Sequence, residues 1–220
     1  QGLYLPEFEH DNCGAGFICS LTGKRSNDII HKALEILVKL EHRGAVSADG
    51  VTGDGAGILI DIPHKFFEKS CNFTLPNSGE YAVSNVFLPK KENQRNYCIN
   101  VFENEIKNQG LQLIGWRNVP VNSKVLGEIA KETEPFVKQL FIGKSDKKQS
   151  DEDFKLKLFA ARKITEHTIY DSKLSEAMFF YVPSLSTKII IFKGLLKPEH
   201  INEYYLDLFD ADLDTRLALV

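Results

Sequence analysis

The sequence is poor in the residues that hold small secreted scaffolds and zinc domains together. It has four cysteines in 220 residues, and no two of them form a CxxC pair. Disulfide-rich scaffolds and zinc sites need closely spaced cysteine pairs, so the cysteine pattern excludes both classes and suits a reducing compartment. The six histidines show no metal-ligand spacing along a helix. We therefore predict no metal site.

The sequence also lacks a strong excess of positive or negative charge and a long apolar run. The chain has 27 Lys and Arg against 30 Asp and Glu, a formal net charge of -3, without a basic stripe. Nucleic-acid partners favour basic surfaces, so none is expected. No run reaches the roughly 18 to 20 apolar residues that span a bilayer, and the first residues lack a signal-peptide pattern. We expect a cytoplasmic protein with no membrane partner, or a plastid protein if the source is a plant or alga.

What the chain does have is enough apolar residues, 43%, for one sizeable core. Residues 13–21 are β-rich and predict a strand. Apolar residues at spacings of three and four predict a helix that Ser26 can cap and that ends at Gly44. A glycine-rich turn at 52–57 leads into a strand at 58–62, which Pro63 ends.

The remaining pattern mixes helices with strands. We predict strands at 81–88, 112–116 and 136–142, and helices at 92–108 and 154–170, with an exposed loop at 143–153. Two β-rich runs at 177–182 and 187–192, joined by residues 183–186, predict a hairpin. Hairpins with long helices favour a layered α+β domain over a doubly wound parallel sheet, whose strands would each need a crossover helix.

One cysteine stands out, because Cys13 is followed by the small residues Gly14, Ala15 and Gly16. Small neighbours let a substrate approach the sulfur, although an unpaired cysteine more often packs as a small apolar side chain. Arg43 lies where a cation complements a helix dipole. The turn at 52–57 lacks the GKS/T ending of a phosphate-binding loop, so we interpret it as a tight turn. No Ser-His-Asp arrangement is present.

Several segments together identify a family. The chain contains GLYLPEFEHDNCGAGF, LEHRGAVSADGVTGDGAGILIDIPHKFF, GWRNVPVN, LGEIAKETEP and FYVPSLSTKIIIFKGLL in this order. They resemble the N-terminal class II glutamine amidotransferase domain of glutamate synthase large chains, and the resemblance runs almost end to end. It implies a four-layer αββα sandwich of two antiparallel sheets, the N-terminal nucleophile hydrolase type.

The resemblance also implies roles for individual residues. Residues 1–12 would be a propeptide, and residues 13–220 would be the amidotransferase domain, incomplete at its C-terminus. Cys13 would attack the glutamine side chain and release ammonia through a thioester, with Arg43 in a supporting role. Gly14 and Gly16 would lie near the substrate. The main glutamine-binding residues would lie beyond Val220, so we expect the 220 residues alone to be nearly inactive.

For the whole enzyme, the resemblance implies that the ammonia aminates 2-oxoglutarate in the rest of the large chain, which would carry FMN and an iron-sulfur cluster. The expected partners are glutamine, the remainder of the large chain, and either a small subunit that oxidises NAD(P)H or ferredoxin.

Three alternatives stay open. One is an amidotransferase of another biosynthetic enzyme, which would not share GWRNVPVN and FYVPSLST. Another is a truncated, non-catalytic interaction module. The third is a thiol redox protein using Cys13 and Cys19, whose separation along a strand would hold the two sulfurs apart unless the chain bends.

Overall fold

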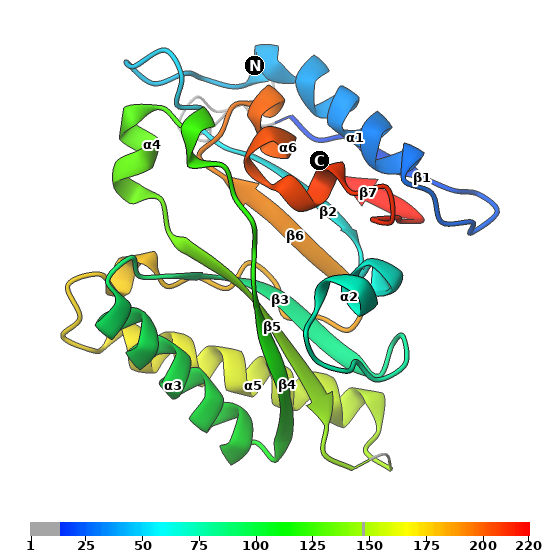
Figure 1. Ribbon diagram of the computed structural model, residues 1–220, viewed down its shortest axis with the longest axis vertical. Helices are drawn as coiled ribbons and strands as arrows, with labels where there is room; N and C mark the ends of the chain where they lie inside the picture. The colour runs from blue at the N-terminus through cyan, green and yellow to red at the C-terminus, as the bar shows by residue number, and fades with distance from the viewer. Residues whose placement is uncertain (1–13, 147) are drawn as a thin grey trace, which may run out of the picture.

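The computed structural model describes residues 14–146 and 148–220, and it shows two stacked sheets between layers of helices (Figure 1). The first sheet contains β1 (Phe17–Cys19), β2 (Ala56–Asp61), β6 (Ile189–Gly194) and β7 (Leu217–Leu219) in the order β1-β7-β2-β6. The second contains β3 (Tyr81–Leu88), β4 (Leu111–Asn118) and β5 (Phe136–Lys144) in the order β3-β5-β4. Neighbouring strands are antiparallel in both sheets, which confirms the predicted fold class.

Helix α1 (Asp28–Lys39) covers the first sheet with its apolar face. Its first turn is held by the Ser26 hydroxyl, which accepts a hydrogen bond of 3.1 Å from the Asp28 amide. A 3-10 turn, η2 (Glu41–Arg43), follows the helix. Five α1 residues are buried, at the spacing that the sequence predicted: Ile29, Ile30, Ala33, Leu34 and Leu37.

Two long helices, α3 (Glu92–Asn108) and α5 (Asp151–Tyr170), cover the outer face of the second sheet (Figure 1). The bounds of α3 are those predicted, whereas α5 begins three residues before the predicted start, within the predicted loop. The Ser150 hydroxyl explains the earlier start, because it caps α5 by accepting a hydrogen bond from the Asp153 amide. The shorter elements are α2 (His64–Ser70), η3 (Ser123–Val125), α4 (Glu128–Thr133), η4 (Ala177–Phe179), η5 (Pro198–His200), α6 (Ile201–Tyr204) and η6 (Leu206–Phe209).

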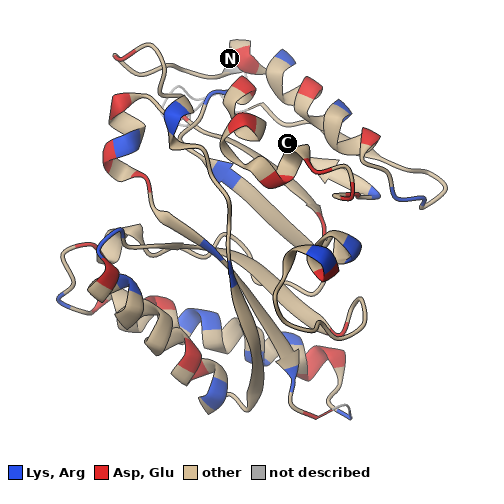
Figure 2. Cartoon of the chain, in the orientation of Figure 1, with Lys and Arg blue, Asp and Glu red and all other residues tan. Residues whose placement is uncertain are grey.

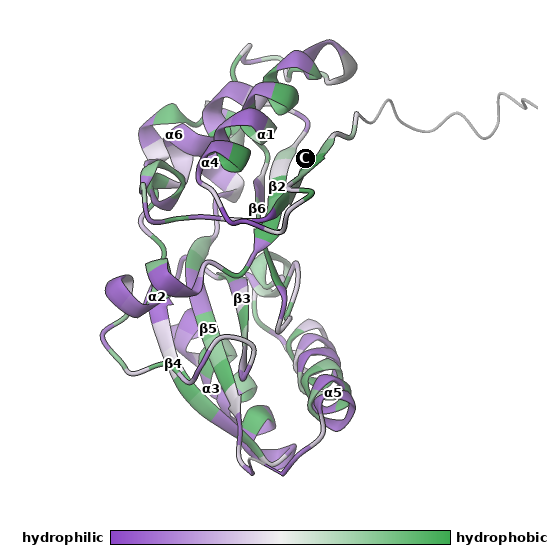
Figure 3. Cartoon of the chain, turned by 90° about the vertical axis from the view of Figure 1, so that its right-hand side faces the viewer, coloured by the Kyte–Doolittle hydropathy of each residue, from purple (hydrophilic) through white to green (hydrophobic). Residues whose placement is uncertain are grey.

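The apolar core has two parts, one on each side of the second sheet. Between the sheets, the Phe67 ring meets the Phe141 ring edge-on, with centroids 5.0 Å apart. On the outer side, Phe102 and Phe154 belong to a separate cluster that joins α3 and α5 to the sheet. Figure 3 shows the helix layers in side view, and Figure 2 shows acidic and basic residues interspersed along the helices. In the second sheet, β3 and β5 are therefore mostly buried on both faces, whereas β4 is mostly of intermediate exposure.

The predicted hairpin of residues 177–182 and 187–192 is wrong. The first arm begins with η4, and Tyr181 then forms a bridge with Phe87 of β3, in the second sheet. The second arm corresponds to β6, which pairs with β2 in the first sheet. The edge of β3 is free to take the first arm, and Pro183 has no amide hydrogen with which to continue a ladder. The segment therefore connects the two sheets.

Candidate functional site

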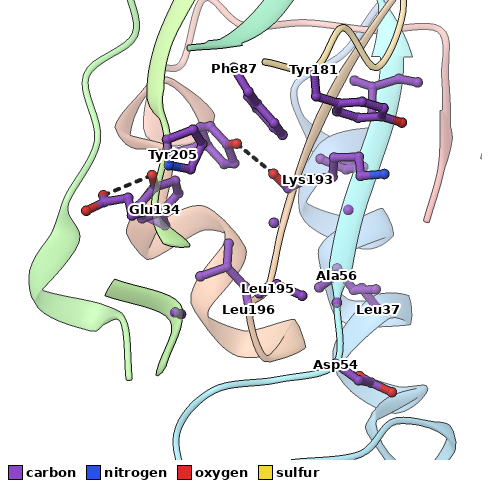
Figure 4. Close-up of a pocket in the computed structure, with 18 of the residues that line it drawn as sticks. Leu37, Asp54, Ala56, Phe87, Glu134, Tyr181, Lys193, Leu195, Leu196 and Tyr205 are labelled. Atoms are coloured by element: carbon purple, nitrogen blue, oxygen red, sulfur yellow. Dashed lines mark hydrogen bonds between the residues drawn. The ribbon is translucent and has the colours of Figure 1, made fainter. Parts of the chain in front are cut away.

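A cavity of about 740 Å³ lies at one end of the first sheet (Figure 4). Gly14 and Ala15, which precede β1, line it, as do Asp54 and Gly55, which precede β2. The last residues of β6 and β7 also line it. Because these strands are antiparallel to β1 and β2, two strands begin and two strands end at this cavity. The first residues of the described chain and the turn before β2 thus line the same cavity.

The wall of the cavity is mainly apolar, with a few charged groups. Asp54, Glu134 and Lys193 supply the charges. A mainly apolar cavity with a few convergent polar groups is the usual form of a small-molecule site. Apolar side chains complete the wall, among them Leu37, Phe87, Leu126, Met178 and Leu196.

Two neighbouring tyrosines fix polar groups along this wall (Figure 4). The Tyr205 hydroxyl donates to the Lys193 carbonyl oxygen at 2.7 Å. The Tyr204 hydroxyl donates to Glu134 Oε1 at 3.1 Å, and the Ser123 hydroxyl donates to the same oxygen at 2.6 Å. Burial raises the pKa of Tyr204 and of Tyr205 far above the ordinary tyrosine value. Both hydroxyls therefore stay protonated at neutral pH and act as donors.

Lys193 reaches the same cavity from β6. Its side chain is exposed, and its ammonium nitrogen lies 5.0 Å from the centroid of the Tyr181 ring. A cation over an aromatic face is attracted by the ring quadrupole. The cavity thus has a basic group on a wall that is otherwise mostly apolar.

The two predicted substrate-binding glycines differ in their surroundings. Gly14 is exposed and lines the cavity. Gly16 is paired with Val220, through hydrogen bonds of 2.9 Å and 2.8 Å between their backbones. A Cβ atom at Gly16 would lie 2.3 Å from Ile36 Cγ2, so the close approach of β1 to α1 requires glycine there. The contacts of Gly16 are those of packing.

The predicted nucleophile, Cys13, lies outside the described residues, so its role stays a prediction. Arg43 is the last residue of η2, and its side chain also lies outside the described part of the chain. The position of its backbone is defined, because the Gly44 amide donates to the Glu41 carbonyl oxygen at 2.9 Å. A Cβ atom at Gly44 would lie 3.2 Å from an Asp54 carboxylate oxygen. The turn that carries Arg43 therefore adjoins a residue of the cavity wall.

The other three cysteines are unpaired thiols. Burial raises the pKa of Cys71 to about 11 and that of Cys98 to about 11. Since the thiolate is the reactive form, both are poor nucleophiles at neutral pH. Cys19 is exposed on β1.

Sequence reasoning missed three polar groups of the cavity. Asp54 falls in the turn that we interpreted as tight geometry alone. Glu134 and Lys193 fall within two of the segments that carry the family resemblance, but no spacing rule brings residues so distant in sequence into one cavity. The residues next to Glu134 and Lys193 in the sequence form no motif that would indicate a shared site.

Within residues 14–146 and 148–220, no helix has the length and apolar character to cross a membrane. The same part of the chain contains no group of three or more His, Cys, Asp or Glu residues arranged to hold a metal ion.

Comparison with known proteins places the chain among relatives of much greater length. It is 42% identical over 221 residues to the "Glutamate synthase [NADPH] large chain" of Bacillus subtilis, covering 100% of this chain and 14% of that protein. It is 40% identical over 232 residues to "Glutamate synthase [NADH]" of Saccharomyces cerevisiae, covering 100% of this chain and 10% of that protein. It is 36% identical over 214 residues to "Ferredoxin-dependent glutamate synthase 2" of Synechocystis, covering 96% of this chain and 13% of that protein.

The family described as "Glutamine amidotransferases class-II" matches residues 13–220. This match begins at Cys13 and continues to the last residue, so it includes both sheets and the residues that line the cavity. The chain belongs to the class-II glutamine amidotransferases.

Proposed function

We propose that the chain is the glutaminase domain of a glutamate synthase, and that Cys13 is its nucleophile. One observation carries the proposal: the family match begins at Cys13, and the next two residues, Gly14 and Ala15, line the cavity. Cys71, which is partly buried, and Cys98, which is buried, have raised pKa values, which makes them poor competitors for the role.

The proposed chemistry needs residues 1–12 to be removed as a propeptide, so that Cys13 carries a free α-amine. An α-amine titrates near 7.7 to 8.0, so a useful fraction is neutral at physiological pH and accepts the thiol proton. The sulfur attacks the side-chain amide carbon of glutamine. The amide nitrogen then leaves as ammonia, taking up that proton, and water hydrolyses the thioester to glutamate and restores the thiol.

Arg43 and the glycines have supporting roles in this proposal. The turn that ends at Arg43 adjoins Asp54, whose carboxylate accepts a hydrogen bond of 2.9 Å from the Ala45 amide. Since Asp54 lines the cavity, this contact supports a position for the turn beside the substrate. Gly14 would let the backbone lie close to glutamine, and Gly16 would hold β1 against α1.

In the same proposal, the ammonia aminates 2-oxoglutarate in the remainder of a large chain. The names of the relatives specify NADPH, NADH or ferredoxin, so the electron donor would be either a small subunit that oxidises NAD(P)H or ferredoxin. FMN and an iron-sulfur cluster would be carried by that remainder of the large chain. Glutamine hydrolysis uses neither group.

The test is to replace Cys13 with alanine in the protein as cells produce it, and to compare two activities. We expect glutamine-dependent glutamate synthesis to fall by about 10⁴-fold or more, because the nucleophile is lost. Synthesis from added ammonia should be retained. Cys19→Ala is the matched control, because Cys19 is an exposed thiol close to Cys13 in the sequence, and it should keep both activities.

Glutamine-dependent synthesis that survives Cys13→Ala would contradict the assignment. A wild-type protein that uses ammonia but not glutamine would instead support the alternative of a non-catalytic module.

A further inference from the structure

Residues 45–54 form a narrow antiparallel ribbon directly after the turn that carries Arg43. Its first rung is double, because the Asp54 amide donates to the Ala45 carbonyl oxygen at 3.1 Å and the Ala45 amide donates to Asp54 Oδ2 at 2.9 Å. Val46 and Gly53 form the next bridge, and the Ser47 amide donates to the Thr52 carbonyl oxygen at 2.8 Å. Three consecutive rungs therefore connect the tip of the ribbon to residues 41–44.

At the tip of the ribbon, the carboxylate of Asp49 accepts four hydrogen bonds. Oδ1 accepts from the amides of Val51 and Thr52, at 3.0 Å and 2.8 Å. Oδ2 accepts from the Thr52 hydroxyl at 2.6 Å and from the Ile129 amide at 3.3 Å. These bonds, chiefly those from Thr52, hold the pKa of Asp49 well below the ordinary aspartate value. The carboxylate stays ionised throughout the neutral range.

The contact with Ile129 caps helix α4 from a distant part of the chain. The N-cap residue of α4 is Gly127, which has no side chain to satisfy the free amides of the first turn. Asp49 accepts from the Ile129 amide, and the Thr52 hydroxyl accepts from the Ala130 amide at 3.3 Å. A Cβ atom at Gly127 would lie 2.4 Å from Asp49 Oδ2 and 2.4 Å from Thr52 Oγ1, so only glycine allows this docking.

The ribbon also packs closely against the backbone at Leu196, the residue that Gly53 approaches. A Cβ atom at Gly53 would lie 2.3 Å from the Leu196 carbonyl oxygen. Leu196 and Ala130 both line the cavity, and Thr52, which precedes Gly53 and contacts Ala130, has 2% of its surface exposed. The ribbon therefore packs against two segments of the cavity wall, at Ala130 and at Leu196. Asp54, at the base of the ribbon, lines the cavity as well.

We propose that Asp49 and Thr52 are positioning residues for glutamine hydrolysis: they dock the ribbon on α4 and so fix the turn that carries Arg43 beside the cavity. The inference rests on the proposed function for the role of Arg43. Without the docking contacts, the ribbon would be held at its base and by Gly53, and the turn would gain freedom to move. A misplacement of about 1 Å in an active site can lower the rate about 10²-fold.

Two nearly isosteric variants break the docking with little change of shape. In Asp49→Asn, the amide oxygen can still accept from the Val51 and Thr52 amides, but the NH₂ group then faces the Ile129 amide, which is also a donor. Thr52→Val removes the hydroxyl that connects Asp49 with Ala130, whereas Thr52→Ser keeps it. Asp146→Asn is the control for the carboxylate, because Asp146 Oδ1 accepts from the Lys148 amide at 2.9 Å in a loop remote from the cavity.

The experiment measures glutaminase kcat and KM, ammonia-dependent synthesis, and amide hydrogen exchange, in the protein as cells produce it. We expect Asp49→Asn and Thr52→Val to lower kcat about 10- to 100-fold, with KM for glutamine changed less than about threefold and ammonia-dependent synthesis retained. Exchange should accelerate over residues 41–54 in both variants. Thr52→Ser and Asp146→Asn should match the wild type.

The proposal is overturned if exchange over residues 41–54 accelerates while kcat stays at the wild-type value, or if exchange over residues 41–44 does not change. A failure of the proposed function would appear differently, because the wild type itself would then lack glutaminase activity.

Discussion

Replacing Asp207 with alanine removes one partner of a buried ion pair that holds the cavity wall to the second sheet. Arg117 of β4 donates from both terminal nitrogens to the Asp207 carboxylate, at 2.7 Å and 2.8 Å. The side chains are 12% and 3% exposed. Asp207 lies in η6, directly after the two tyrosines of the cavity wall. The pair therefore anchors the segment that follows α6.

The size of the effect follows from what the substitution leaves behind. Arg117 would keep a hydrogen bond of 2.8 Å to Gln139 and one of 3.3 Å to the Ser70 carbonyl oxygen, but its buried charge would have no carboxylate. Removing one partner of a buried pair costs about 3 to 5 kcal/mol, whereas replacing both partners with apolar residues is often close to neutral. We expect Asp207→Ala to lower the free energy of unfolding by about 3 to 5 kcal/mol. The double variant Arg117→Met with Asp207→Leu should be close to the wild type in stability.

Urea unfolding measures this directly, because Trp116, the single tryptophan of the sequence, is next to Arg117 and reports the transition by its fluorescence. The midpoint of Asp207→Ala should fall by more than about 1 M urea. Lys157→Ala is the control, since it removes an exposed pair with Asp153, and its free energy of unfolding should change by less than about 1 kcal/mol. An Asp207→Ala midpoint equal to that of the control would refute the reasoning.

Three further predictions concern thiols, tyrosines and a helix cap. At pH 8, iodoacetamide should modify exposed Cys19 before Cys71, whose pKa partial burial raises to about 11; equal rates by peptide mapping would contradict this shift. The pKa values of Tyr204 and Tyr205 in the folded state lie above the unfolded value of about 10. As pH rises above about 10, these tyrosines ionise in the unfolded state first, so the free energy of unfolding falls. Absorbance near 295 nm should show these tyrosines ionising with unfolding, and not before it. Ser150→Ala should cost about 1 kcal/mol by urea unfolding, because α5 loses its cap; an unchanged midpoint would show that the cap contributes nothing.

Elements with a strong local pattern could be predicted from the sequence. Helix α3 and strand β3 begin and end at the predicted residues. The error at residues 177–192 has a non-local cause, because the two arms pair with strands of different sheets. Helix α4 was not predicted, because its N-cap is Gly127, which has no side chain to cap the helix. The capping groups come from far away in the sequence: Asp49 lies 80 residues before Ile129, and Thr52 lies 78 residues before Ala130.

The residues of the candidate site also divide into those with a local sequence pattern and those that only long-range contacts bring together. The small residues after Cys13 drew notice because they are local, and Gly14 does line the cavity. Glu134 and Lys193 reach the cavity only through the pairing of distant strands and the packing of α6, which no sequence period encodes. The role of Cys13 itself remains a prediction that rests on the family resemblance and on the residues beside it.

The central claim is that Cys13 becomes an N-terminal nucleophile, and intact mass spectrometry of the protein from cells tests it most directly. The protein is weighed before and after treatment with a diazo-ketone analogue of glutamine, and the modified peptide is sequenced. The account predicts a mature chain that begins at Cys13 and gains one adduct on that residue. A chain that retains residues 1–12, or an adduct on Cys19 in place of Cys13, would contradict it.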